Sequence, residues 1–166
     1  MPFIYDICHG YIPYNDTETR FLDNHWVKRL KRIKQLGLLE HVFPSASHSR
    51  FEHSLGVSHI GENYVDILLR NSGKPHYYQN NFKFCVKMAG LFHDLGHGPF
   101  SHVFDNVVIK DSKNCHEMRS RRIVEEIFKE VGTSGGFSSA YVIDYIKEMI
   151  EPVTNNYSYN PFFDIV

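Results

Sequence analysis

Residues 82–99 read FKFCVKMAGLFHDLGHGP, and this stretch decides the fold. Between Phe82 and Leu95, charge occurs only at Lys83, Lys87 and Asp94, so a helix formed here is apolar almost all round. A helix of that kind is buried at the centre of a domain. The glycine at position 96 is a natural end for it. The sequence therefore predicts a central helix over residues 82–95.

The flanking sequence shows the apolar spacing of further helices. That spacing predicts helices over residues 23–36, 51–70, 116–131 and 139–150, and a short helical turn over 99–104. Asp23 or Asn24 is the expected cap of the first. Asn114 and Glu117 resemble a capping box that opens the helix over 116–131. Gly132 is expected to close that helix.

The remaining segments add little regular structure. The first twenty residues, with Gly10 and Pro13, favour irregular structure or a short β-hairpin. Strand-like alternation is nearly absent elsewhere, and 166 residues fit one domain. The sequence therefore predicts an all-α fold, a helical bundle forming a single domain over 1–166.

Composition limits the classes of function. The net charge of −1 creates no overall field toward nucleic acid or anionic membranes, and the longest apolar runs are far shorter than a membrane span. The first ten residues lack the pattern of a signal peptide. Three cysteines without a CxxC pair suit a reducing compartment. We expect an intracellular protein of the cytoplasm or nucleus, with neither membrane nor nucleic acid as partner.

Histidines around the end of the central helix indicate a metal site. His93 and Asp94 are adjacent there, and burying them is costly unless something compensates. A divalent cation does so, because imidazole and carboxylate are both metal ligands. His97 lies one turn beyond His93 if the helix continues, and His102 can fold back over the same place. His53, on the predicted core face of its helix, is the candidate ligand from another helix.

Each of these residues also has a simpler interpretation. His53 could be a hydrogen-bonded core histidine. The His93-Asp94 pair could be a helix-end hydrogen bond, since a histidine suits a helix C-terminus, and His97 could be solvated. The convergence of four histidines and one aspartate favours the metal site.

Several motifs occur in order along the chain. They are KRIKQLG at 31–37, VFPSASH at 42–48, RFEHSLGV at 50–57, AGLFHDLGHGPFSH at 89–102 and the pair Phe104-Asp105. Weaker matches are Asp6 with His9-Gly10, and residues 145–148. Together they resemble the HD-domain phosphohydrolases, and within them the deoxynucleoside triphosphate (dNTP) triphosphohydrolase branch. The match covers essentially the whole chain.

The resemblance implies a residue set and a reaction. The metal ligands would be His53, His93 and Asp94. The catalytic group would be His102, Asp105 and His116. Among the substrate contacts, Gln35 would bind the sugar, Arg50 a phosphate, and His97 would line the phosphate pocket. The implied reaction releases deoxynucleoside and triphosphate from a dNTP. Arg binds phosphate through a bidentate fork, and a histidine can protonate the departing oxygen. The metal could be Fe, Mn, Zn or Mg, and a homo-oligomer is left open.

Two departures from the family pattern matter. The family's fourth metal ligand lies in a motif resembling Gly-Ile-Asp-x-Asp-Lys-x-Asp-Tyr, and this chain stops where that motif would begin. Asp144 and Asp164 lack the matching context, so we expect an N-terminal fragment, a split gene product or a degraded relative. Lys28 and Lys31 replace two polar residues of the pattern with which the animal enzyme binds an activating guanine nucleotide.

These observations rank the functions. A metal-dependent dNTP phosphohydrolase is the leading hypothesis, and a nucleotidase or phosphodiesterase on the same metal chemistry is the first alternative. A non-catalytic HD module that binds nucleotide or pairs with a full-length relative is the second. Nucleic-acid binding through the basic residues of 28–34 is the weakest, because acidic residues balance the charge.

Overall fold

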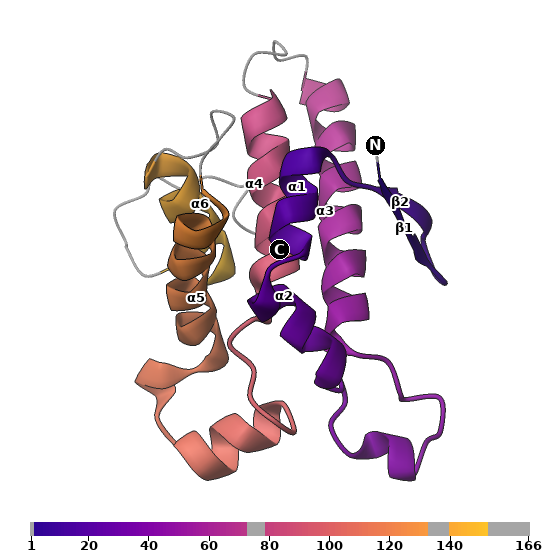
Figure 1. The fold of residues 1–166 in the computed structure, drawn as a ribbon, viewed down its shortest axis with the longest axis vertical. Helices are drawn as coiled ribbons and strands as arrows, with labels where there is room; N and C mark the ends of the chain where they lie inside the picture. The colour runs from indigo at the N-terminus through magenta and orange to yellow at the C-terminus, as the bar shows by residue number, and fades with distance from the viewer. Residues whose placement is uncertain (1, 73–78, 133–139, 153–166) are drawn as a thin grey trace.

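The computed structural model describes residues 2–72, 79–132 and 140–152 (Figure 1). Strands β1 (Phe3–Asp6) and β2 (Gly10–Pro13) pair antiparallel in an N-terminal hairpin. The helices are α1 (Asp16–Leu22), α2 (His25–Arg29), α3 (Arg50–Ser72), α4 (Gln79–Phe92), α5 (His116–Val131) and α6 (Ala140–Ile150). Short 3₁₀ turns cover Leu30–Arg32, Leu39–His41 and Ser112–Asn114, and a π-helix covers Phe104–Ile109. The predicted all-α class with a short hairpin is confirmed.

Helix α4 is the central element. It lies beside α3, with α1 across it and α5 and α6 on its other flank (Figure 1). The side chains of Met88, Leu91 and Phe92 are fully buried, as the apolar character of this helix predicts. A Cβ atom on Gly90 would lie 2.9 Å from the Ser58 backbone. Glycine therefore permits the close approach of α3 and α4 that places the first turn of α3 near the end of α4.

The helix predicted over residues 23–36 is shorter in the structure, and a helix that was not predicted precedes it. Helix α2 begins after its Asn24 cap, as expected, but ends at Arg29 and continues only as a 3₁₀ turn. Ile33 is extended, and Lys34 pairs with Ser49 in an isolated β-bridge. Helix α1 lies where irregular structure was predicted, and a capping box between Asn15 and Glu18 opens it.

Three further boundaries differ from expectation. Helix α4 ends at Phe92, so His93 and His97 lie in a turn and not on one helix face. Helix α5 begins at His116, and its N-cap residue, Cys115, makes no side-chain cap hydrogen bond, so the predicted capping box at Asn114 is wrong. The expected helical turn over 99–104 is only partly formed: residues 99–101 make a tight turn in which Phe100 and Ser101 adopt positive φ, and helical structure begins at His102.

Two sequence expectations fall wholly or partly outside the described residues: the start of the last helix at Ser139, and Asp164. Among the residues that are described, none of the helices has the length and apolarity needed to cross a bilayer.

Candidate metal centre and catalytic pocket

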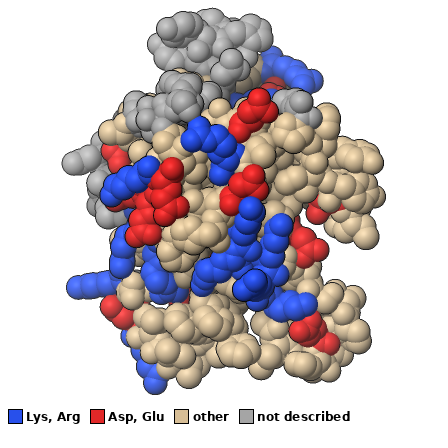
Figure 2. Space-filling view, in the orientation of Figure 1, with Lys and Arg blue, Asp and Glu red and all other residues tan. Residues whose placement is uncertain are grey.

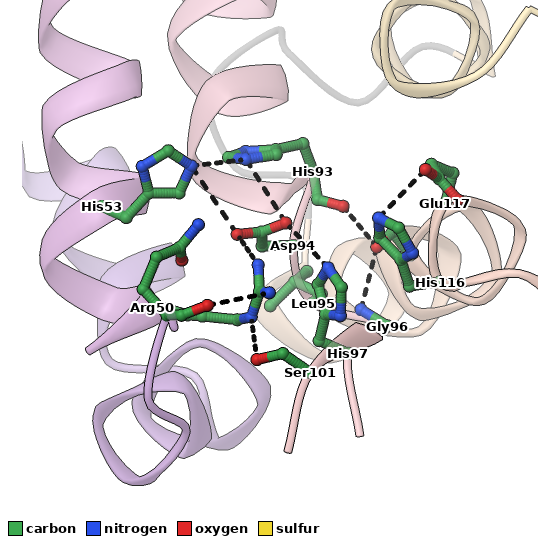
Figure 3. A network of polar contacts seen from close by, with 12 residues as sticks. Arg50, His53, His93, Asp94, Leu95, Gly96, His97, Ser101, His116 and Glu117 are labelled. Carbon is green, nitrogen blue, oxygen red and sulfur yellow. Dashed lines mark hydrogen bonds and ion pairs between the residues drawn. The ribbon is translucent and has the colours of Figure 1, made fainter. Parts of the chain in front are cut away.

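The turn after α4 faces the first turn of α3, and three candidate ligands meet there (Figure 3). The ligand atoms of His53, His93 and Asp94 all lie within 4.8 Å of one another. His93 Nε2 is 3.3 Å from His53 Nε2 and 3.4 Å from Asp94 Oδ1, and His53 Nε2 is 3.8 Å from Asp94 Oδ2. The structure therefore brings together the three residues that the sequence predicted as metal ligands.

The chemical state of these side chains suits a cation. His93 Nδ1 lies 2.8 Å from the Gly90 carbonyl oxygen, to which it can donate only as N–H, and this tautomer leaves Nε2 free as a ligand. Burial lowers the pKa of His53, with a partial offset from Asp94. Burial alone would raise the pKa of Asp94, but His97, His93 and Arg50 hold it well below its usual range. A neutral imidazole and a carboxylate are the forms that bind metal.

Arg50 is tied to this centre by its guanidinium. It is 1% exposed, and its Nη1 donates to Asp94 Oδ2 at 2.6 Å. Its Nε donates to Ser101 Oγ at 3.0 Å, and Ser101 Oγ donates to the Lys34 carbonyl at 2.8 Å. The longest of its bonds joins Nη2 to the Gln35 carbonyl at 3.4 Å. The residue predicted to contact phosphate thus lies directly against a candidate metal ligand.

A second histidine group lies beside the first. Its members are His97, His102 and His116, whose ligand atoms also lie within 4.8 Å of one another. The rings of His97 and His116 stack at 3.7 Å, and His102 meets His97 edge-on at 4.9 Å. His97 is fully buried, its Nε2 lies 3.4 Å from Asp94 Oδ1, and its Nδ1 has no hydrogen-bond partner among the described residues. Burial lowers the pKa of His97 to about 4, so the ring is neutral near pH 7.

His116 is oriented by a carboxylate. Its Nδ1 lies 2.9 Å from Asp105 Oδ2, and Arg119 binds the other oxygen of Asp105. Burial would raise the pKa of Asp105, but Arg119 and His116 outweigh it and lower that pKa. The other ring nitrogen, Nε2, lies 3.0 Å from Glu117 Oε1. Asp105 and His116, two of the three residues in the catalytic group that the resemblance implies, are therefore in contact, and Glu117 is an added neighbour that the sequence did not single out.

Two pockets adjoin the histidines. One of about 380 Å³ contains Gln35, Ser101 and His102 on its walls, with apolar Leu36, Leu38, Phe100 and Val103. The Gln35 Oε1 atom is buried without a hydrogen-bond partner among the described residues. The other pocket, of about 480 Å³, lies between the hairpin turn at Asp6–His9 and α3, and includes His53. The structure thus places an accessible cavity beside each histidine group.

Comparison with known proteins agrees with this geometry. The HD domain family profile matches residues 50–160. The "Deoxynucleoside triphosphate triphosphohydrolase SAMHD1 homolog" of Dictyostelium discoideum is 44% identical over 115 residues, covering 68% of this chain and 22% of that protein. Human "Deoxynucleoside triphosphate triphosphohydrolase SAMHD1" is 39% identical, covering 90% of this chain and 25% of its own length. An HD domain-containing protein, L394, of Acanthamoeba polyphaga mimivirus is 36% identical, covering 89% and 35%.

This chain therefore spans between about a fifth and a third of the length of the relatives it matches. The profile match covers both histidine groups and α5. The predicted resemblance is confirmed: the chain belongs to the HD domain family of phosphohydrolases.

Proposed function

We propose that this HD domain hydrolyses deoxynucleoside triphosphates to deoxynucleoside and triphosphate, using a divalent cation held by His53, His93 and Asp94. One observation carries the proposal: the ligand atoms of these three residues converge within 4.8 Å of one another beside a second histidine group. The names of the Dictyostelium and human relatives support a dNTP as the substrate.

The proposed centre has three protein ligands, which leaves positions for water and substrate. A cation bound there would polarise a phosphate oxygen and lower the pKa of water. His97, neutral near pH 7, is proposed to contact the phosphates, because its buried Nδ1 has no hydrogen-bond partner among the described residues.

The pocket with Gln35 and His102 is the proposed place for the sugar and base. A sugar hydroxyl would satisfy the unpartnered Gln35 Oε1. His102, on the pocket wall, is the proposed proton donor to the departing oxygen, and Asp105 holds His116 beside it. Arg50 is proposed to contact a phosphate through Nη2, because the bond from Nη2 to the Gln35 carbonyl, at 3.4 Å, is the longest hydrogen bond of this guanidinium.

The test combines metal content with product identity. The purified chain is analysed for bound metal, then incubated with dATP or dGTP and added Mn²⁺ or Mg²⁺. We expect release of deoxynucleoside and inorganic triphosphate, and loss of both metal and turnover in Asp94→Ala. Parallel reactions with NTPs, monophosphates and cyclic nucleotides identify a nucleotidase or phosphodiesterase by its products. Full metal occupancy in Asp94→Ala would sink the ligand assignment.

A non-catalytic HD module is the second candidate, favoured by the group of only three ligands among the described residues. Such a module would bind nucleotide, or pair with a full-length relative and alter its assembly. Mixing the chain with an active relative and measuring oligomer size and dNTP turnover distinguishes the two. Metal binding with no turnover alone, but a changed rate in the mixture, would identify the module. Light scattering of the chain by itself tests for a homo-oligomer.

A further inference from the structure

The turn that carries the candidate metal ligands is held by an arginine from α2. Arg29 Nη1 donates to the Leu95 carbonyl at 3.1 Å, and its Nη2 donates to the His97 carbonyl at 2.6 Å. One guanidinium thus spans two carbonyls of the turn from a helix 66 residues earlier in the chain. Basic side chains gather over α2 on the face shown in Figure 2. Arg29 is half-buried, whereas Lys28 and Arg32 are exposed.

Helix α5, which follows the turn in the chain, also donates hydrogen bonds to it. Arg119 Nε donates to the Gly96 carbonyl at 2.8 Å. Ser120 Oγ donates to the His93 carbonyl at 2.6 Å and accepts the Gly96 N–H at 2.8 Å. A Cβ atom on Gly96 would lie 2.0 Å from the His116 carbonyl oxygen, so α5 can approach only a glycine here.

These contacts supply hydrogen-bond donors to backbone carbonyls of the turn. A buried carbonyl without a hydrogen-bond partner is costly. In the turn that follows α4, side chains donate to the carbonyls of His93, Leu95, Gly96 and His97, and three of these four bonds come from Arg29 and Arg119. Burial lowers the pKa of the Arg29 guanidinium, and the nearby charge of Arg119 lowers it further. Holding like charges close together is unfavourable, and the hydrogen bonds of Arg29 to the Leu95 and His97 carbonyls and of Arg119 to the Gly96 carbonyl offset that cost.

We propose that Arg29 and Arg119 are positioning residues that set the backbone of the His93–His97 turn, and through it the ligand atoms of His93 and Asp94. These two hydrogen bonds of Arg29 go to backbone carbonyls, so its effect on the ligand atoms is indirect. The inference rests on the proposed metal function for its consequence, but the restraint of the backbone can be measured without metal.

The experiment compares Arg29→Ala, Arg29→Lys and Arg119→Ala with Arg122→Ala. Arg122 is the matched control because it is an exposed arginine on the same helix as Arg119 that binds the Asn114 side chain instead. Amide hydrogen exchange is measured by NMR in EDTA. We expect Arg29→Ala to speed exchange at Leu95 and His97 about 10-fold or more, while exchange in the middle of α3 is unchanged. Arg29→Lys should fall between, since an ammonium lacks the fork that spans two carbonyls.

The second readout is the affinity for Co²⁺, followed by its visible absorption. We expect Arg29→Ala and Arg119→Ala to weaken binding about 10- to 100-fold, as for other partners of metal ligands, and Arg122→Ala to leave it unchanged. Unchanged exchange in both alanine variants overturns the proposal, and so does faster exchange with unchanged Co²⁺ affinity. If the wild-type chain binds no Co²⁺, the proposed metal function fails, and the exchange rates alone decide whether the two arginines restrain the turn.

Discussion

Arg50 Nη1 lies 2.6 Å from Asp94 Oδ2, with the two side chains 1% and 5% exposed. This ion pair joins the first residue of α3 to the turn after α4. The other oxygen of Asp94 lies 3.4 Å from both His93 Nε2 and His97 Nε2. One carboxylate therefore connects the candidate metal ligands, the second histidine group and a buried cation.

The ion pair makes the stability of the metal-free chain depend on Arg50. Removing one partner of a buried pair leaves an uncompensated charge, which costs about 3–5 kcal/mol. We expect Arg50→Met to lower the free energy of unfolding by about that amount in EDTA, measured by urea denaturation. Saturating Mn²⁺ should restore part of the loss, because a cation beside Asp94 replaces the missing charge. Arg70→Met, at the exposed end of the same helix, should change stability by less than about 0.5 kcal/mol. A loss below about 1 kcal/mol for Arg50→Met would contradict this account.

A second buried cation, Lys87, supports the core between α1, α3 and α4. Its Nζ lies 3.0 Å from both Glu18 Oε2 and Glu62 Oε2 and donates to the Pro13 carbonyl, with the lysine side chain 2% exposed. We expect Lys87→Met to cost about 3–5 kcal/mol in urea denaturation, because the buried Glu18 loses its counter-charge and Glu62 is left with Lys83, 3.6 Å away.

Lys83 provides the matched control for this prediction. It lies one turn earlier on α4 and pairs with Asp66 at 2.7 Å, but its side chain is 30% exposed. Lys83→Met should therefore cost only about 0–1 kcal/mol. Equal losses in the two variants would mean that burial does not distinguish these ion pairs.

The helices of this fold could largely be predicted from local sequence, but the residues at which they end could not. The apolar character of α4 and the spacing on α3 and α5 predicted the central bundle. Beyond Phe92 the Gly96 N–H donates to the Ser120 side chain of α5 and not to the Phe92 carbonyl, and that acceptor is distant in sequence. Ile33 leaves the helical path because its carbonyl accepts the Arg50 N–H at 2.8 Å, which is also a long-range contact.

The candidate site shows the same division. The spacing of His93, Asp94 and His97 pointed to a cluster, although their turn geometry did not follow from helical periodicity. Phe100 and Ser101 adopt positive φ angles, which reverse the chain before His102. Because neither residue is a glycine, nothing in the sequence indicated this reversal. Arg29 appeared only as one member of a basic segment, because its carbonyl partners are defined by tertiary packing.

The first turn of α3 adds a pH-dependent contribution to stability. Ser49 N–H and hydroxyl both donate to Glu52 Oε2, at 2.6 and 2.7 Å, and these bonds lower the pKa of Glu52. A lowered folded-state pKa stabilises the fold fully above the unfolded value of about 4.3, and the contribution is lost as pH falls through the folded value. We expect Glu52→Gln to cost about 0.5–1 kcal/mol at pH 7, and the difference from wild type to shrink below about pH 4.

The measurement is urea denaturation from pH 3 to 7 in EDTA. Glu126→Gln, an exposed substitution within α5, is the control and should show no such pH-dependent difference. A difference for Glu52→Gln that grew as the pH fell would have the wrong sign for a depressed carboxyl pKa.

Metal binding should itself stabilise the chain, and the gain identifies the ligands without any assay of turnover. A ligand that binds only the folded state at 100 times its Kd adds about 2.7 kcal/mol to the free energy of unfolding. We expect that gain with Mn²⁺ in the wild type and none in His93→Ala, because His93 contributes the Nε2 atom that its bond to the Gly90 carbonyl leaves free. His59→Ala is the control: its ring lies 5.7 Å from that of His9 and outside both histidine groups, so the gain should persist. An equal gain in His93→Ala would place the cation elsewhere, and loss of the gain in both variants would point to a general effect of losing a histidine. Because the folded chain offers the same Asp94 carboxylate to Arg50 and to the cation, the gain should be larger in Arg50→Met than in the wild type.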